Sequence, residues 1–262
     1  MTLFDTHAHY WDTRFAAEYG AAETEALLDS LLGGDVPHIV NVATDPPSAR
    51  LAISQAACHP GMLTALGIHP NDGQMLADPD AAIAEIEAML RDPASRAVAV
   101  GEIGLDYHYE DTNREKQHAI FRAQMRLAER LSLPVVIHDR DAHGDCVAIV
   151  REFPNVCGIF HSFSGSAEMA RELCSLGYYI SFSGTVSFKN AERVRAVAAT
   201  VPKDRLLIET DCPYLAPHPH RGKLNHSGYL SFTNEALAAA IGLFPDECAA
   251  LTTENAKRIF NI

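Results

Sequence analysis

Short apolar runs rich in β-branched residues recur along the whole chain, and amphipathic stretches with helical spacing separate them. Eight runs predict strands at residues 3–6, 38–43, 63–68, 97–102, 134–138, 156–161, 178–183 and 206–210. The intervening spacing predicts helices at 22–32, 79–90, 114–131, 167–176 and 191–199, and a closing helix at 253–262 capped by Thr253. Because parallel strands need a crossover helix between them, this alternation predicts an α/β fold, a (β/α)8 TIM barrel of parallel strands.

A doubly wound open sheet would satisfy the same alternation. Its nucleotide-binding forms have a Gly-x-Gly-x-x-Gly turn after the first strand or a Walker sequence, and this chain has neither. No Pro/Gly-rich linker divides the chain, and the Pro- and His-rich residues 213–220 are expected to form a loop after the last strand. We therefore expect one domain over residues 1–262.

The net charge of −13, from 34 acidic and 21 basic residues, argues against an extended phosphate-binding surface. It leaves room for a small basic funnel around one site. Six cysteines lack Cys-x-x-Cys spacing, and no apolar run is long enough to span a bilayer, so we expect a cytoplasmic protein with reduced thiols and no membrane partner. Nothing in the predicted helix faces demands a dimer, so a monomer is expected.

His7 and His9 follow the first apolar run and are separated by one residue. Side chains at positions i and i+2 of a strand point to the same face, so both imidazoles are expected to converge. Imidazole is the commonest metal ligand, and a converging pair suggests a divalent cation. Two partly buried histidines hydrogen-bonded to the backbone would give the same short pattern, so the rest of the chain has to decide.

Residues of the same ligand type fall at the ends of five further predicted strands. They are His69, Glu102, His138, His161 and Asp211. In a barrel of this type the active site lies at the C-terminal ends of the strands, so all of these side chains should meet at one rim.

Six residues of this set fit a site for two cations: His7, His9, Glu102, His138, His161 and Asp211. The histidines of the first strand and Asp211 can bind one cation, the histidines of strands five and six can bind the second, and the two carboxylate oxygens of Glu102 can bridge them. Mixed imidazole and carboxylate ligands suit zinc, manganese or iron, and magnesium less well. The expected cofactor is thus two divalent cations, Mg²⁺, Mn²⁺ or Zn²⁺, which would polarise a bridging water for an in-line displacement.

Other polar residues near this rim are candidate substrate contacts. His69 belongs here, and Asp106 could contact substrate, orient a ligand histidine or cap a loop. Four basic residues follow the ends of strands five, seven and eight and would suit a phosphate-bearing substrate, although individually such residues are more often solvated surface residues: Arg140, Lys189, Arg221 and Lys223.

Taken together, these residues resemble the TatD family of metal-dependent deoxyribonucleases. The resemblance rests on motifs in family order along the whole chain, at residues 5–9, 67–70, 101–107, 137–140, 161–165, 209–217, 220–225 and 253–256. It implies a distorted (β/α)8 barrel of the amidohydrolase type, with two divalent cations on the six residues above. It also implies phosphodiester hydrolysis, often as a 3′-to-5′ exonuclease on single-stranded DNA, with Asp211 as the proton acceptor and Glu102 as the second catalytic carboxylate.

The chain departs from the family pattern at two places. The family often has a further histidine after the motif at 67–70, where this chain has Asn71 and Asp72, and usually has Glu-Pro after Asn225, where this chain has His226 and Ser227. Both changes lie where substrate would sit. His226 could be a replacement contact or a solvated loop residue.

Three functions remain compatible with the sequence. The first is hydrolysis of DNA ends, with single-stranded DNA as the partner. The second is ester or amide hydrolysis on the same barrel, for example of an aminoacyl-tRNA, since a fold does not choose the bond. Amidase relatives often have a bridging lysine where this chain has Glu102, which favours the phosphodiesterase. The third is a metal- or partner-binding protein with a dead site, against which all six ligands are present.

Overall fold

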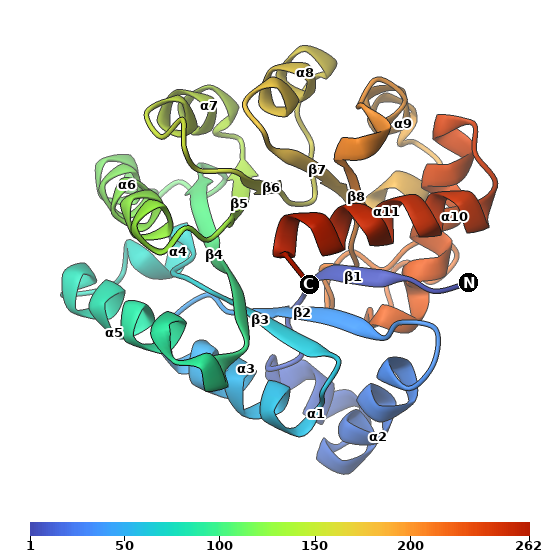
Figure 1. Cartoon of the computed structure of the whole chain (residues 1–262), viewed down its shortest axis with the longest axis horizontal. Coiled ribbons are helices and arrows are strands. Elements are labelled where there is room, and N and C mark those ends of the chain that lie inside the picture. Colours follow the sequence, from blue (N-terminus) through green and yellow to red (C-terminus); the bar gives the residue numbers. More distant parts are fainter.

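The computed structural model describes all 262 residues and contains one eight-stranded sheet. Its strands are ordered as in the sequence, and each neighbouring pair is parallel. The strands are β1 Phe4–Ala8, β2 His38–Val42, β3 Met62–Leu66, β4 Ala97–Asp106, β5 Val135–Arg140, β6 Gly158–Phe160, β7 Tyr179–Phe182 and β8 Leu206–Ile208. Figure 1 shows these strands around a common centre, with most helices outside them and α11 across the ends of β8 and β1. The predicted TIM barrel and all eight predicted strands are confirmed.

The barrel is distorted where its first and last strands meet. Strand β8 has only three residues, and the contact with β1 is made beyond its end, by an isolated parallel bridge between Ala8 and Cys212. The amide of His9 donates to the carbonyl of Cys212 at 2.8 Å, and the amide of Asp211 donates to the carbonyl of His7 at 2.9 Å. The seam of the barrel therefore runs through three of the predicted ligands.

Eleven helices surround the strands. They are α1 Thr13–Tyr19, α2 Ala21–Leu32, α3 Pro46–Cys58, α4 Pro70–Gly73, α5 Pro79–Arg91, α6 Arg114–Leu131, α7 His143–Arg151, α8 Ala167–Ser175, α9 Glu192–Ala198, α10 Leu230–Ile241 and α11 Pro245–Phe260. Short 3₁₀ turns η1 Pro93–Ser95, η2 Gly184–Ser187, η3 Lys203–Arg205 and η4 Ser227–Tyr229 complete the chain. The five predicted internal helices are present within one residue at each end, and residues 213–220 form the predicted loop.

The prediction for the closing helix was wrong at its start. Helix α11 begins at Pro245 rather than near Thr253, with Pro245 in the first turn followed by Asp246 and Glu247. Proline suits a first turn because its missing N–H has no partner there, and acidic side chains favour the same end. Thr253 lies in the middle of the helix, where its hydroxyl donates to the carbonyl of Thr2 at 3.4 Å.

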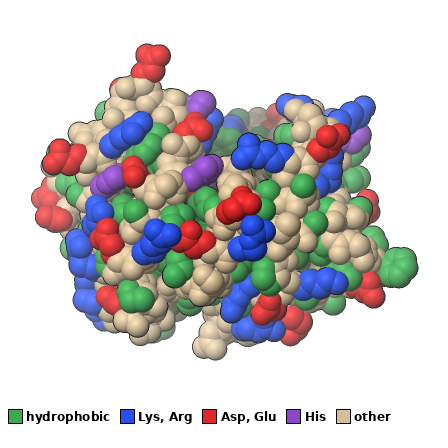
Figure 2. Space-filling model, turned by 90° about the horizontal axis from the view of Figure 1, so that it is seen from above, with side chains coloured by type: hydrophobic (Ala, Val, Ile, Leu, Met, Phe, Trp, Pro, Cys, Tyr) green, Lys and Arg blue, Asp and Glu red, His purple; other side chains and the backbone are tan.

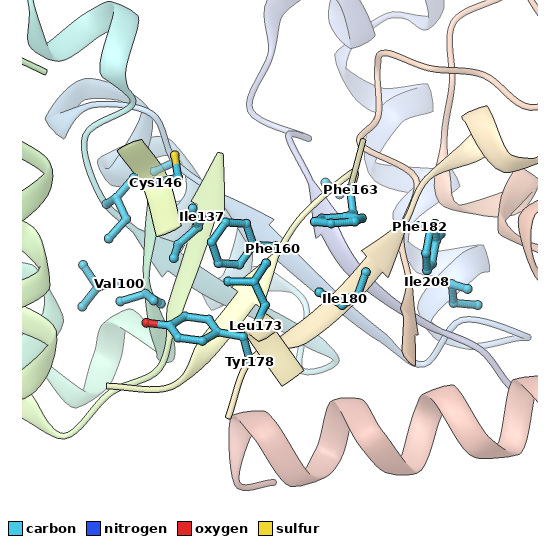
Figure 3. Packing of buried hydrophobic residues seen from close by; sticks show 14 of the residues in the cluster. Val100, Ile137, Cys146, Phe160, Phe163, Leu173, Tyr178, Ile180, Phe182 and Ile208 are labelled. Atoms are coloured by element: carbon cyan, nitrogen blue, oxygen red, sulfur yellow. The ribbon is translucent and has the colours of Figure 1, made fainter. Parts of the chain in front are cut away.

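Two clusters of buried apolar side chains form the core of the protein. A cluster of 13 buried residues takes at least one side chain from every strand, so it lies inside the barrel, and helix α11 contributes Phe260, whose ring stacks on Phe4. A larger cluster of 51 residues fills the space between strands and helices. Figure 3 shows part of it, with Ile137, Phe160 and Ile180 of successive strands packed beside one another.

The six cysteines are all free, as expected from their spacing. No single helix is long and apolar enough to cross a membrane. Helix α10 with its preceding turn would reach that length and composition only together with α11, and the two are bent by 103° to each other.

The carboxamide of Asn255 should contribute strongly to stability. It is buried, and its Nδ2 donates to the carbonyls of Lys203 and Leu206 at 2.8 and 2.9 Å, which fixes α11 to the start of β8. Replacing it by leucine removes a buried donor from both carbonyls, of which that of Lys203 keeps the amide of Leu206. Asn255→Leu should therefore lower the free energy of unfolding by about 1–3 kcal/mol, measured by urea denaturation. The exposed Asn155, which donates to Glu129, provides the matched control, and an Asn155→Leu change should cost under about 0.5 kcal/mol. Equal losses in the two variants would contradict this role.

Candidate metal centre

Glu102 reaches the barrel interior through a break in strand register. Strand β4 continues to Asp106, so Glu102 lies inside the strand and not at its end as predicted; the pairing with β5 shifts between Val100 and Ile103. At this shift the amide of Glu102 donates to the carbonyl of Ala43, at the end of β2, at 2.9 Å. A side chain on Gly101 would lie 2.6 Å from Cβ of Val136, and one on Gly67 would lie 2.8 Å from the backbone of Gly101. Only glycine permits this close approach of β3, β4 and β5.

The first group of ligand-type atoms lies at the seam between β1 and β8. Nε2 of His7 and Nε2 of His9 are 3.1 Å apart. Oδ1 of Asp211 lies 3.7 Å from the former and 3.3 Å from the latter. Oε2 of Glu102 completes the group, at 3.4 Å from His7 and 3.7 Å from His9.

The second group gathers around the other oxygen of Glu102. Its Oε1 lies 2.8 Å from Nδ1 of His138 and 2.9 Å from Nε2 of His161, and these two nitrogens are 3.2 Å apart. The rings of His7 and His161 stack with centroids 4.1 Å apart, which joins the two groups. The carboxylate of Glu102 thus faces a pair of imidazoles on each side.

These separations fit metal ligation. Donor atoms about 2 Å from a tetrahedral cation lie about 3.3 Å from one another, and the first group spans 3.1 to 3.7 Å. The structure therefore places the six predicted ligands where they could hold divalent cations: His7, His9 and Asp211 on one side, His138 and His161 on the other, and Glu102 between them.

Three of the imidazoles are held from behind by an acceptor. Nδ1 of His9 contacts the carbonyl of Val42 at 2.7 Å, Nε2 of His138 contacts Oδ2 of Asp106 at 3.2 Å, and Nδ1 of His161 contacts Oε1 of Glu209 at 3.2 Å. An acceptor behind the ring fixes the proton on the far nitrogen and leaves the other nitrogen free to bind a cation. Asp106, a candidate substrate contact in the sequence, thus lies behind His138.

The carboxylates and imidazoles of the cluster shift one another's pKa values. Burial opposes ionisation of Glu102, but His161, His7 and His138 together hold the pKa of its carboxyl well below the ordinary value. Burial likewise opposes protonation of His161, but Glu102 and Glu209 raise its pKa well above the ordinary value. Burial raises and His9 lowers the pKa of Asp211, with a net shift downward. The carboxylates are thus ionised at neutral pH, which is the form that binds metal.

Several residues that the sequence did not single out position this cluster. Asp5 is fully buried; its Oδ1 accepts from the amide of Thr210 and its Oδ2 accepts from the hydroxyls of Thr210 and Ser227. Asn225 donates from Nδ2 to the carbonyl of Thr210 at 2.9 Å. Asp5 and Glu209 lie in the quoted family motifs, and an acidic residue within a buried strand is the signal that could have found both.

His69 lies at the inner edge of the second group. Its ring packs edge-on against His138 with centroids 4.4 Å apart, and its Nε2 is 3.8 Å from Oε1 of Glu102. The amide of Asn71 donates to its Nδ1 at 3.2 Å. Burial, with His138 second, lowers its pKa to about 3, so at neutral pH the ring is uncharged and carries its proton on Nε2, toward the site.

The four predicted cations are exposed and have no acidic partner within ion-pair distance. Arg140 lies over the ring of Tyr109, and Arg221 lies over the ring of Phe188 at 4.5 Å, next to Lys189 in sequence. The loop that carries Arg221 and Lys223 is tied to η2 by the amide of His218, which donates to Oγ of Ser187 at 2.8 Å. The structure shows no contact between any of the four and the six ligands.

Comparison with known proteins identifies the family. The family model described as TatD related DNase matches residues 4–261. The chain belongs to the TatD family. A metal-dependent hydrolase of Bacillus subtilis, YabD, is 41% identical over 99% of each chain, and YcfH of Escherichia coli is 36% identical over 100% of this chain and 97% of its own. The crystal structure of YjjV, a TatD homologue of Escherichia coli, superposes with a TM-score of 0.89 at 30% identity and covers 99% of this chain and 98% of its own. The TatD-family chain described here is accordingly a metal-dependent hydrolase.

Metal binding should be measurable as added stability. A cation at about 100 times its Kd contributes about 2.7 kcal/mol, which for a chain of this size raises Tm by about 5–10 °C. We expect Mn²⁺ or Zn²⁺ to raise the Tm of EDTA-stripped protein by this amount in differential scanning fluorimetry. Glu102→Gln should lose at least half of the rise, and the exposed Glu254→Gln should keep it. A full metal-induced rise in Glu102→Gln would rule out Glu102 as a ligand.

Proposed function

We propose that this protein is a deoxyribonuclease that removes nucleotides from the 3′ end of single-stranded DNA by metal-dependent phosphodiester hydrolysis. The observation that carries the proposal is the placement of Glu102, whose two carboxylate oxygens each face a separate pair of imidazoles. One bridging carboxylate between two ligand groups suits two neighbouring cations, and paired cations suit displacement at phosphorus. The family description, TatD related DNase, supports the same reaction.

The residues of the chain divide the chemical work. When bound, two cations supply a water of lowered pKa and neutralise charge on the phosphate oxygens. Asp211, at the seam and with a pKa held low, accepts the proton of the attacking water on its carboxylate. Glu102 holds the two ligand groups at a fixed separation. His69, uncharged and with its proton on Nε2, donates a hydrogen bond to a substrate oxygen at the inner edge of the site.

The charge distribution supports a short contact with DNA. Figure 2 shows acidic and basic side chains interspersed over one face, with no continuous basic stripe. The unpaired Lys189, Arg221 and Lys223 lie on loops after β7 and β8, on the same side of the barrel as Asp211. Three basic side chains can contact only a few phosphates, which suits an enzyme that binds the end of a single strand rather than a long duplex.

The reaction is tested with single-stranded DNA labelled at the 3′ end or the 5′ end, with Mg²⁺ or Mn²⁺. We expect stepwise shortening from the 3′ end, which EDTA abolishes. Asp211→Asn keeps the shape of the side chain but removes its basicity, so kcat should fall by about 10²–10⁴-fold. Because Asp211 belongs to the first ligand group only, metal-induced stabilisation should fall in part and not disappear. The exposed Asp204→Asn, before β8, should keep full activity.

Two outcomes of this assay would contradict the proposal. Shortening from the 5′ end would overturn the polarity. Intact DNA in every lane, with metal bound, would exclude the nuclease, and esters such as aminoacyl-tRNA would become the next substrates to assay.

The basic side chains Arg221 and Lys223 should affect the affinity for DNA and the dependence of that affinity on salt concentration. Each phosphate contact to single-stranded DNA contributes about −0.7 to the slope of log K against log salt. Arg221→Gln and Lys223→Gln should each raise KM and reduce the magnitude of this slope by about 0.7, with kcat unchanged, in titrations at increasing NaCl. Lys203→Gln, at the opposite end of β8, is the control and should change neither quantity. Unchanged slopes in both loop variants would place the DNA elsewhere.

A further inference from the structure

Two aromatic rings flank His9, and the chemistry above uses neither. The ring of Trp11 lies 5.7 Å from that of His9, and the ring of Tyr214 lies 6.2 Å from it; both are nearly perpendicular to the imidazole, at 79° and 82°. Trp11 follows β1 and Tyr214 follows β8, so both stand on the seam side of the metal centre. Tyr214 is 47% exposed and Trp11 is partly buried.

Trp11 is fixed relative to the metal centre by a shared acceptor. Its Nε1 donates to the carbonyl of Val42 at 2.6 Å, and Nδ1 of His9 contacts the same oxygen at 2.7 Å. One backbone atom thus sets the position of a ligand imidazole and of the neighbouring indole.

Tyr214 is fixed through both its backbone and its ring. Its amide donates to the carbonyl of Asp211 at 2.9 Å, and its carbonyl accepts from Nδ2 of Asn225 at 2.7 Å. The guanidinium of Arg14 lies over the ring at 3.9 Å, and the Nε and terminal nitrogen of Arg14 are held by both carboxylate oxygens of Asp12. A half-exposed ring held this way loses little entropy when a ligand stacks on it.

The surface beside Trp11 is hollowed and unsuited to phosphate. A hollow of about 220 Å³ is lined by Trp11, Pro47 and Leu51 together with Asp12 and Asp45. The carboxylate of Asp12 is paired with Arg14, and that of Asp45 disfavours a phosphate. The aromatic and aliphatic walls accept an uncharged planar group, and the carboxylate of Asp45 can accept a hydrogen bond from its amino or imino groups. The basic side chains proposed to contact phosphate do not line this hollow.

We propose that Trp11 and Tyr214 form a stacking subsite for the nucleobase of the nucleotide that flanks the scissile bond. This inference rests on the proposed phosphodiesterase function and adds to it how the substrate is oriented: the base lies on the seam side of the barrel, against the two rings, and the phosphates lie toward the cations after β7 and β8. Stacking accepts every base, so this subsite recognises nucleic acid without selecting sequence.

The chain provides its own reporter, because Trp11 is its only tryptophan. We would titrate the metal-loaded protein with thymidine 5′-monophosphate and with 2-deoxyribose 5-phosphate, which has the same sugar and phosphate but no base. Saturable quenching of tryptophan fluorescence by the nucleotide, and none by the sugar phosphate, is the expected result. Equal quenching by both compounds would overturn the subsite. If the rings only shielded His9 from water, the presence of a base would not change the fluorescence of Trp11.

Variants of the second ring test the pair without altering the reporter. Tyr214→Leu should raise the Kd of the nucleotide about 5- to 100-fold and raise KM for DNA similarly with kcat unchanged, while Tyr214→Phe should retain wild-type values. Phe244→Leu, a 77% exposed aromatic at the start of α11, is the matched control.

The two proposals fail in different ways. DNA shortening without base-dependent quenching would overturn the stacking subsite and leave the phosphodiesterase standing. Base-dependent quenching by a protein that leaves DNA intact would support the subsite and overturn the reaction.

Discussion

The carboxylate of Glu102, enclosed by imidazoles, is the interaction on which the other features of the site depend. The residue is 3% exposed, and burying an ionised carboxylate is strongly unfavourable unless partners compensate it. His138 and His161 lie 2.8 and 2.9 Å from one oxygen and His7 lies 3.4 Å from the other. The register shift in β4 and the close approach at Gly101 let the carboxylate project inward from the middle of a strand. A side chain at Gly101 would remove the space that brings Glu102 between its partners.

The groups behind the imidazoles extend this constraint outward. Each of Val42, Asp106 and Glu209 fixes a far nitrogen, so the orientation of the metal-facing nitrogens is set by the fold before any cation binds. Asp5 fixes the backbone at the seam. Its two carboxylate oxygens accept from the amide and the hydroxyl of Thr210, the residue before Asp211. Asp211 and the two histidines at the end of β1 therefore keep their spacing although β8 is short and its pairing with β1 is reduced to a bridge.

The sequence predicted the fold and selected six residues that the structure brings together, because both depend on local information. The spacing of apolar residues along the chain predicts the strands and helices. Because the strand ends of a barrel meet at one rim, the residue type at each end is enough to select His138 or His161 as a candidate ligand. The inward turn of Glu102 escaped prediction because it depends on the distance between β3, β4 and β5 and not on a spacing along the chain. Glu209 and Asp5 were missed for the same reason, since their partners lie 48 and 205 residues away. The start of α11 was misplaced because Pro245 was not taken as a first-turn residue.

The two departures from the family pattern fall around this rigid centre. Asn71 donates to Oδ2 of Asp106 at 2.9 Å, on the same oxygen that faces His138, so the residue at this position acts on a ligand imidazole through its neighbour. His226 packs against Tyr229 with ring centroids 4.0 Å apart, and burial, with His220 second, lowers its pKa to about 4, so it is an uncharged packing residue at neutral pH. Where the family usually has a glutamate, this chain thus has a neutral ring. The segment that follows Arg221 and Lys223 therefore carries one negative charge fewer at neutral pH than the family pattern would give it, and its ring packs on Tyr229 instead.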